Sequence, residues 1–89
     1  MAARLIYMYM TEWIQYDTNT GIIAINIASK ADDLIRVQRL DNDGSICEKF
    51  LLEQNGSTQI DTRSWTNGIW FIRVEKKQEV QLKRILITK

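Results

Sequence analysis

TNGIWFIRV, residues 66–74, gives the clearest indication of the fold, because a polar segment is followed directly by an apolar run that starts after Gly68. Within the run, Trp70, Ile72 and Val74 recur at spacing two. This is the period at which the side chains of a β-strand point to the same face. We therefore predict a core strand over residues 68–76, with Trp70 on the face that packs into the core.

Similar short segments recur on both sides of this strand and are separated by turn-forming residues. Ile23, Ile25 and Ile27 alternate with smaller or polar residues, which is typical of a half-buried strand. The segment Asp41-Asn-Asp-Gly44 favours a hairpin turn, because Asn, Asp and Gly accept left-handed backbone angles. The expected strands cover residues 12–17, 23–27, 34–40, 46–53, 58–61, 68–76 and 79–88. About seven short strands predict an all-β fold, an antiparallel β-sandwich of immunoglobulin-like type.

Length and composition indicate one globular domain. The chain has 89 residues, of which 45% are hydrophobic and 26% charged. We assign residues 12–89 to a single β-sandwich domain and residues 1–11 to a poorly ordered leader or a first strand. The apolar segment Leu5–Met10 is shorter than the ~7–15 residues of a signal-peptide core and the ~18 residues of a transmembrane span. We therefore expect no transmembrane segment.

Charge and residue types argue against several classes of function. The net charge is +1 with both signs scattered along the chain, so we expect no nucleic-acid partner. The chain lacks histidine, and its single cysteine, Cys47, lies within an expected strand, where we interpret it as a small apolar filler. The carboxylates Asp32, Asp33 and Asp61, the last beside Arg63, are interpreted as part of a solvated face or as caps. We predict neither an enzyme nor a cofactor.

One segment resembles part of a calcium loop. In LDNDGSI, residues 40–46, placing Gly44 at the sixth loop position puts Arg39 at the first position and Phe50 at the twelfth. Calcium needs an oxygen ligand at the first position and a bidentate carboxylate at the twelfth. Both are missing, so we predict a plain hairpin turn and no metal site.

The remaining tryptophans differ in their surroundings. Trp13 is expected to pack near the end of the sandwich. Trp65 lies in a polar loop over residues 62–67, so we expect it to be partly exposed and name it as a candidate partner contact. A carbohydrate-binding module would need two or more coplanar exposed aromatic rings, and the sequence does not show such a set.

From Asp41 onward the motifs follow a familiar order. They are Asp41–Gly44, Thr58–Asp61, the block Gly68–Val74, and the closing segment Lys83–Lys89. Over residues 21–89 this pattern resembles the C-terminal sorting domain of the type IX (Por) secretion system. A related family of small immunoglobulin-like proteins from Bacteroidetes is the alternative. Trp70 stands where the family usually has tyrosine, and Tyr16–Asn19 lacks the prolines of the family's Tyr-Pro-Asn-Pro-like opening.

The resemblance implies an export signal that the secretion machinery reads as a folded unit, so the partner would be a protein. It implies that Lys83, Arg84 and Lys89 form the basic determinants of the closing strand and that Gly68 allows a tight start to its strand. The protein would then be exported to the periplasm and on to the cell surface or medium. The rival reading is a stand-alone immunoglobulin-like module that binds a ligand or a cell-surface protein.

Overall fold

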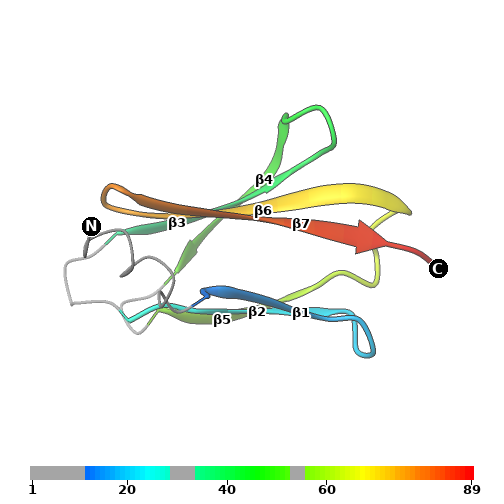
Figure 1. Ribbon diagram of the computed structural model, residues 1–89, viewed down its shortest axis with the longest axis horizontal. Coiled ribbons are helices and arrows are strands. Elements are labelled where there is room, and N and C mark those ends of the chain that lie inside the picture. Colours follow the sequence, from blue (N-terminus) through cyan, green and yellow to red (C-terminus); the bar gives the residue numbers. More distant parts are fainter. Residues whose placement is uncertain (1–11, 29–33, 53–55) are drawn as a thin grey trace, which may run out of the picture.

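A computed structural model describes residues 12–28, 34–52 and 56–89 of the chain. Seven strands form two antiparallel sheets that face each other (Figure 1). They are β1 (Ile14–Asp17), β2 (Ile22–Asn26), β3 (Ile35–Leu40), β4 (Ile46–Leu52), β5 (Ser57–Asp61), β6 (Gly68–Lys76) and β7 (Glu79–Ile87). The predicted seven-stranded, all-β sandwich is thereby confirmed. The predicted leader or first strand over residues 1–11 and the carboxylates Asp32 and Asp33 lie outside the described residues.

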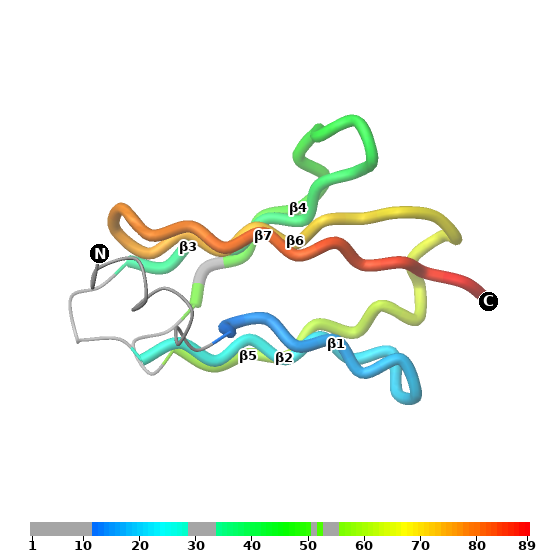
Figure 2. The backbone as a smooth tube through the Cα atoms, viewed as in Figure 1, coloured from blue at the N-terminus to red at the C-terminus, as the bar shows by residue number. Residues whose placement is uncertain are grey.

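Figure 2 shows the backbones of the two sheets lying opposite each other. The core lies between them and is built from alternate residues of the strands. In β3, Ile35 and Val37 are buried whereas Arg36 is exposed, as the period of two predicts. In β6, Ile72 and Val74 are buried on the same face of the sheet. The buried apolar set is Trp13, Ile14, Ile23, Ile25, Ile27, Ile35, Val37, Ile60, Trp65, Ile72, Val74, Ile85 and Ile87.

The β3–β4 turn has the geometry that its residues favour. Gly44 adopts a φ of +86°, in the left-handed region where glycine carries no steric penalty. The Asp41 carboxylate accepts hydrogen bonds from the backbone N–H groups of Asp43 and Ser45, both at 2.9 Å. The carboxylate that suggested a calcium ligand thus holds the hairpin turn.

The two long sides of the sandwich differ. On the β1–β7 side, the N–H of Trp13 donates to Oε1 of Gln81 at 2.9 Å, and Lys83 Nζ donates to Oε1 of Glu12 at 2.6 Å. On the other side, β4 pairs only with β3 and β5 pairs only with β2, so each is an edge strand of its sheet. In the constant-type immunoglobulin arrangement, the fourth strand lies beside the fifth. Here the fourth strand has joined the opposite sheet, so no strand within residues 12–28, 34–52 and 56–89 neighbours the outer edge of β5.

Cys47 lies near the start of β4, where the β3–β4 hairpin projects beyond the rest of the sheet (Figure 1). It is exposed, so its interpretation as an apolar filler was wrong. The sequence places it correctly in a strand, but the register between β3 and β4 shifts beside it, between Arg39 and Leu40. Among the described residues, no helix is long and apolar enough to cross a membrane.

Candidate functional site

Exposed apolar side chains gather on the outer face of the four-stranded sheet, along β6 and β7. Leu82 and Leu86 of β7 are 58% and 53% exposed. The register pairs Leu86 with Ile69, and Arg84, which lies between the two leucines, with Phe71. Ile69 and Phe71 are themselves only half-buried. We call these five residues the outer patch. Exposed apolar clusters with a polar element commonly mark surfaces that bind other proteins.

The three basic residues that the resemblance implied as determinants lie in different surroundings in the structure. Arg84 is exposed in the outer patch, and its side chain makes no hydrogen bond or ion pair with any residue that the structure describes. Lys83 lies opposite the buried Ile72 and reaches the edge of the sandwich, where it forms an ion pair with Glu12 at 2.6 Å. Lys89 Nζ donates to the backbone carbonyl of Arg63 at 2.8 Å. Arg84 is therefore the member of this trio whose charge is free to meet a partner.

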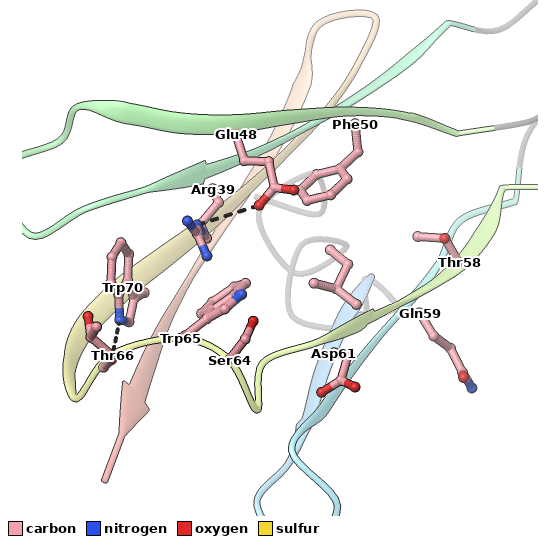
Figure 3. Close-up of a pocket in the computed structure, with 11 residues that line it drawn as sticks. Arg39, Glu48, Phe50, Thr58, Gln59, Asp61, Ser64, Trp65, Thr66 and Trp70 are labelled. Atoms are coloured by element: carbon pink, nitrogen blue, oxygen red, sulfur yellow. Dashed lines mark hydrogen bonds and ion pairs between the residues drawn. The ribbon is translucent and has the colours of Figure 1, made fainter. Parts of the chain in front are cut away.

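A second constellation brings three distant side chains together at one end of the sandwich. The guanidinium carbon of Arg39 lies 4.5 Å from the ring centroid of Trp65 and 4.8 Å from that of Trp70 (Figure 3). The two indole rings are 5.8 Å apart and tilted by 58°. A cation over an aromatic face is attracted to its electron density, so Arg39 holds the two rings in place. The Trp70 Nε1–H donates to the Thr66 carbonyl at 2.9 Å, which ties the loop to β6.

This arrangement corrects the prediction for Trp65. The side chain is only 5% exposed and belongs to the core, so the expected partial exposure was wrong. Its neighbours in sequence are exposed, yet the loop turns its indole inward, against Arg39. Trp70 lies on the core side of β6, as predicted, but it packs against the core from the sheet end and stays half-buried. The role of Trp65 in partner binding stays a prediction.

A cavity of about 510 Å³ lies beside these rings and opens between β4 and β5 (Figure 3). The residues lining it are Arg39, Glu48, Phe50, Thr58, Gln59, Ile60, Asp61, Ser64, Trp65, Thr66 and Trp70. Arg39 Nε is buried and lies 3.8 Å from Oε1 of Glu48, which is too far for a good hydrogen bond. The walls therefore combine aromatic rings with charges that nearly balance, and the cavity is large enough to accept a side chain.

Asp61 and Arg63 form an exposed ion pair at the rim of this cavity. Arg63 Nη2 lies 2.7 Å from Oδ2 of Asp61, and the Arg63 backbone N–H donates to Oδ1 at 2.9 Å. The hydrogen bond from the Arg63 side chain, with help from its backbone N–H, lowers the pKa of Asp61 to about 2. Both groups face solvent, as predicted for the Asp61 carboxylate. Nowhere in the described part of the chain do three His, Cys, Asp or Glu side chains come together as a possible metal site.

Comparison with known families matches residues 19–88 to the family described as the secretion system C-terminal sorting domain. This span includes strands β2 to β7, and hence both the outer patch and the cavity. The chain belongs to this family. A comparison with curated protein sequences finds no match.

Several surface features of this sorting domain were not named from its sequence. Leu82 and Leu86 were missed because both faces of β7 carry apolar residues. Ile85 and Ile87 point into the core, and Leu82 and Leu86 point away from it. Periodicity alone could not show which set is exposed. Arg39 was missed because its two aromatic contacts join β3 to residues more than twenty positions later. Gly68, which the family pattern singled out, has a φ of +138°, a backbone conformation that side chains disfavour.

Proposed function

We propose that this sorting domain is a non-catalytic recognition unit that a component of the type IX secretion machinery binds through the outer patch. The observation that carries the proposal is the position of Arg84. It is exposed and unpaired among the described residues, between the exposed Leu82 and Leu86. The protein that carries the domain would be exported through the periplasm to the cell surface or the medium.

The chemistry of the outer patch suits a protein partner. Burial of exposed apolar surface contributes about 25 cal/mol per Å², so the leucines can supply affinity. An Arg at the centre of such a surface requires a carboxylate or another acceptor on the partner, and charge complementarity of this kind supplies specificity and faster association. Both side-chain types are carried on two paired strands, so the fold presents them as one fixed surface.

A charge reversal tests the proposal in the intact domain. A soluble reporter is fused ahead of residue 1 and expressed in a host with an active type IX system. Arg84→Glu should block export, whereas Lys49→Glu should not. Lys49 is exposed, lies on the same outer face in β4, and undergoes the same change of charge. Both variants should melt within a few degrees of the wild type, because exposed substitutions usually cost under about 0.5 kcal/mol.

The apolar part of the surface has its own matched pair. Leu82→Ser should reduce export, whereas Ile46→Ser, at a residue that is 49% exposed on β4, should leave export unchanged. Equal export of Arg84→Glu and wild type would contradict recognition through the outer patch. A reporter that stays in the periplasm with the intact domain would count against the sorting role itself, and the ligand-binding module would then be the better account.

A further inference from the structure

We propose that the free edge of β5 is a docking site for an extended peptide segment of a partner protein, which would add to the three-stranded sheet as a fourth strand. The segment would lie beneath β4 and place a neutral aromatic side chain in the cavity. We call this site the β5 slot, formed by the backbone of Ser57, Gln59 and Asp61 and by the inner side chains Glu48 and Phe50 of β4. The site lies on the side of the sandwich, away from the outer patch.

The backbone groups of β5 establish the first step. The N–H of Ile27 donates to the carbonyl of Gly56 at 2.8 Å, and the N–H of Thr62 donates to the carbonyl of Gly21 at 2.9 Å. Partner residues along an antiparallel ladder alternate between hydrogen-bonded and non-hydrogen-bonded pairs. The register between β2 and β5 therefore turns the N–H and C=O groups of Ser57, Gln59 and Asp61 away from β2. Three consecutive pairing positions face outward at the spacing that an extended chain requires.

The opposite sheet shows why a strand fits there. The strand orders β1-β2-β5 and β4-β3-β6-β7 give three strands facing four. On the closed side, the residues just before β1 contact β7. Among the strands that the structure describes, β4 is therefore the one left without a counterpart. The register places Glu48 and Phe50 of β4 on the same face as the buried Val37 of β3. That face of β4 is only partly covered, since Glu48 is exposed and Phe50 half-buried. A strand added to β5 would lie under these side chains.

The cavity specifies the kind of side chain that the peptide should carry. Its positive charges, Arg39 and the rim residue Arg63, are matched by the carboxylates Glu48 and Asp61. A charged side chain would disturb this balance, whereas a neutral one would not. Phe50 and the two indoles provide aromatic surface, and the Arg39 guanidinium can stack on an additional ring. Binding by strand addition draws affinity from backbone hydrogen bonds and specificity from such side-chain pockets.

The first experiment selects the peptide and tests the edge. A phage library of random octapeptides is panned on the full chain and counter-selected on Gln59→Pro. Proline lacks the N–H that faces the free edge and is tolerated in edge strands. Gln59→Ala is the matched control, because it changes the same side chain and retains the N–H. Enriched synthetic peptides should contain Phe, Tyr or Trp. They should bind Gln59→Pro about tenfold or more weakly than wild type, and Gln59→Ala within about twofold.

A second experiment needs no protein variant and so remains decisive if Gln59→Pro fails to fold. Two versions of an enriched peptide carry N-methyl groups on alternate amides, in opposite frames. Only the frame that blocks the β5-facing amides should lose binding, by about tenfold or more. Backbone amide signals of Ser57, Gln59 and Asp61 should shift in NMR spectra when the unmodified peptide is added.

Three results would overturn the proposal. If every selected peptide bound wild type and a folded Gln59→Pro variant equally, the edge would not be used. If both methylated frames bound equally, side chains alone would carry the contact. If the free chain formed a dimer that Gln59→Pro abolished, the edge would belong to a second copy of the chain.

Discussion

Replacing Trp65 with alanine should destabilise the domain more than the same change at Trp70. Trp65 is 5% exposed, whereas Trp70 is half-buried and lies at the sheet end. Their neighbours in the sequence suggest the opposite ranking, since Trp70 belongs to the apolar run and Trp65 to a polar loop. The pair of variants therefore tests the packing of the loop and not merely the presence of aromatic residues.

The expected cost follows from the buried area. A buried aromatic side chain hides about 150–250 Å², which at about 25 cal/mol per Å² corresponds to roughly 4–6 kcal/mol as an upper value. Large-to-small substitutions of buried aromatic residues cost about 3–5 kcal/mol, so we expect about 4 kcal/mol for Trp65→Ala. For Trp70→Ala, the lost hydrogen bond to Thr66, the lost ring contact and partial burial give about 2 kcal/mol. A domain of this size has a total stability of only about 5–10 kcal/mol.

Urea unfolding followed by far-ultraviolet circular dichroism measures both costs without relying on tryptophan fluorescence. The slope of the unfolding free energy against urea should be unchanged, so the shift of midpoint reports stability. Arg39→Ala serves as a third variant, and a double-mutant cycle with Trp65→Ala should give a coupling of about 0.5–2 kcal/mol. A loss below about 1.5 kcal/mol for Trp65→Ala, or a larger loss for Trp70→Ala, would refute the inward packing of Trp65.

Two further variants test local features. The Arg63 hydrogen bond lowers the pKa of Asp61 from 3.8 to about 2, so the ion pair stabilises the fold fully above about pH 4 and this contribution disappears as the pH falls towards 2. Asp61→Asn should therefore lose less melting temperature than wild type between pH 4 and pH 2 at low salt, and equal losses would contradict the pairing. Gly68→Ala should cost about 1–3 kcal/mol in urea unfolding, because a φ of +138° is strained for alanine. The cost would come from the backbone alone, since no atom lies within 4 Å of the added Cβ. A cost under about 0.5 kcal/mol would show that this backbone angle is not required.

The strands were predictable because their pattern is local. Trp70, Ile72 and Val74 alternate within one segment, and the observed β6 has the predicted bounds of residues 68–76. The turn at residues 41–44 was also predictable, since Gly44 and the Asp41 side chain satisfy their preferences within a few residues. The other strands differ from their predicted bounds by one or two residues at their ends.

The environment of single side chains was harder to predict because it depends on contacts between distant strands. The exposed neighbours of Trp65 suggested an exposed ring, but Arg39 of β3 covers it. Lys83 and Arg84 are adjacent and both basic, yet they point to opposite faces of β7. Ile85 is buried and lies on the same face of β7 as Lys83, so Arg84 lies on the outer face. With Leu82 and Leu86 on the outer face, either face could have been assigned to the core.

The edge at β7 is covered by other parts of the chain to a different extent than the edge at β5, and this explains why the two proposed surfaces use different chemistry. An exposed edge strand invites pairing with another chain unless it is covered or carries charges. β7 is an edge strand, but the chain before β1 lies against it through the Trp13–Gln81 hydrogen bond and the Glu12–Lys83 ion pair. Recognition at β7 is therefore expected to use the side chains of its outer face.

At β5 the relation is reversed. No strand among the described residues covers its outer edge, because β4 has joined the opposite sheet. Its exposed side chains include Gln59, whose replacement we expect to be tolerated. No other group can donate in place of the backbone N–H of that residue. Binding at β7 should consequently respond to Arg84→Glu and not to proline on β5, and binding at β5 should show the opposite dependence. A single partner sensitive to both changes would mean that the two surfaces form one interface.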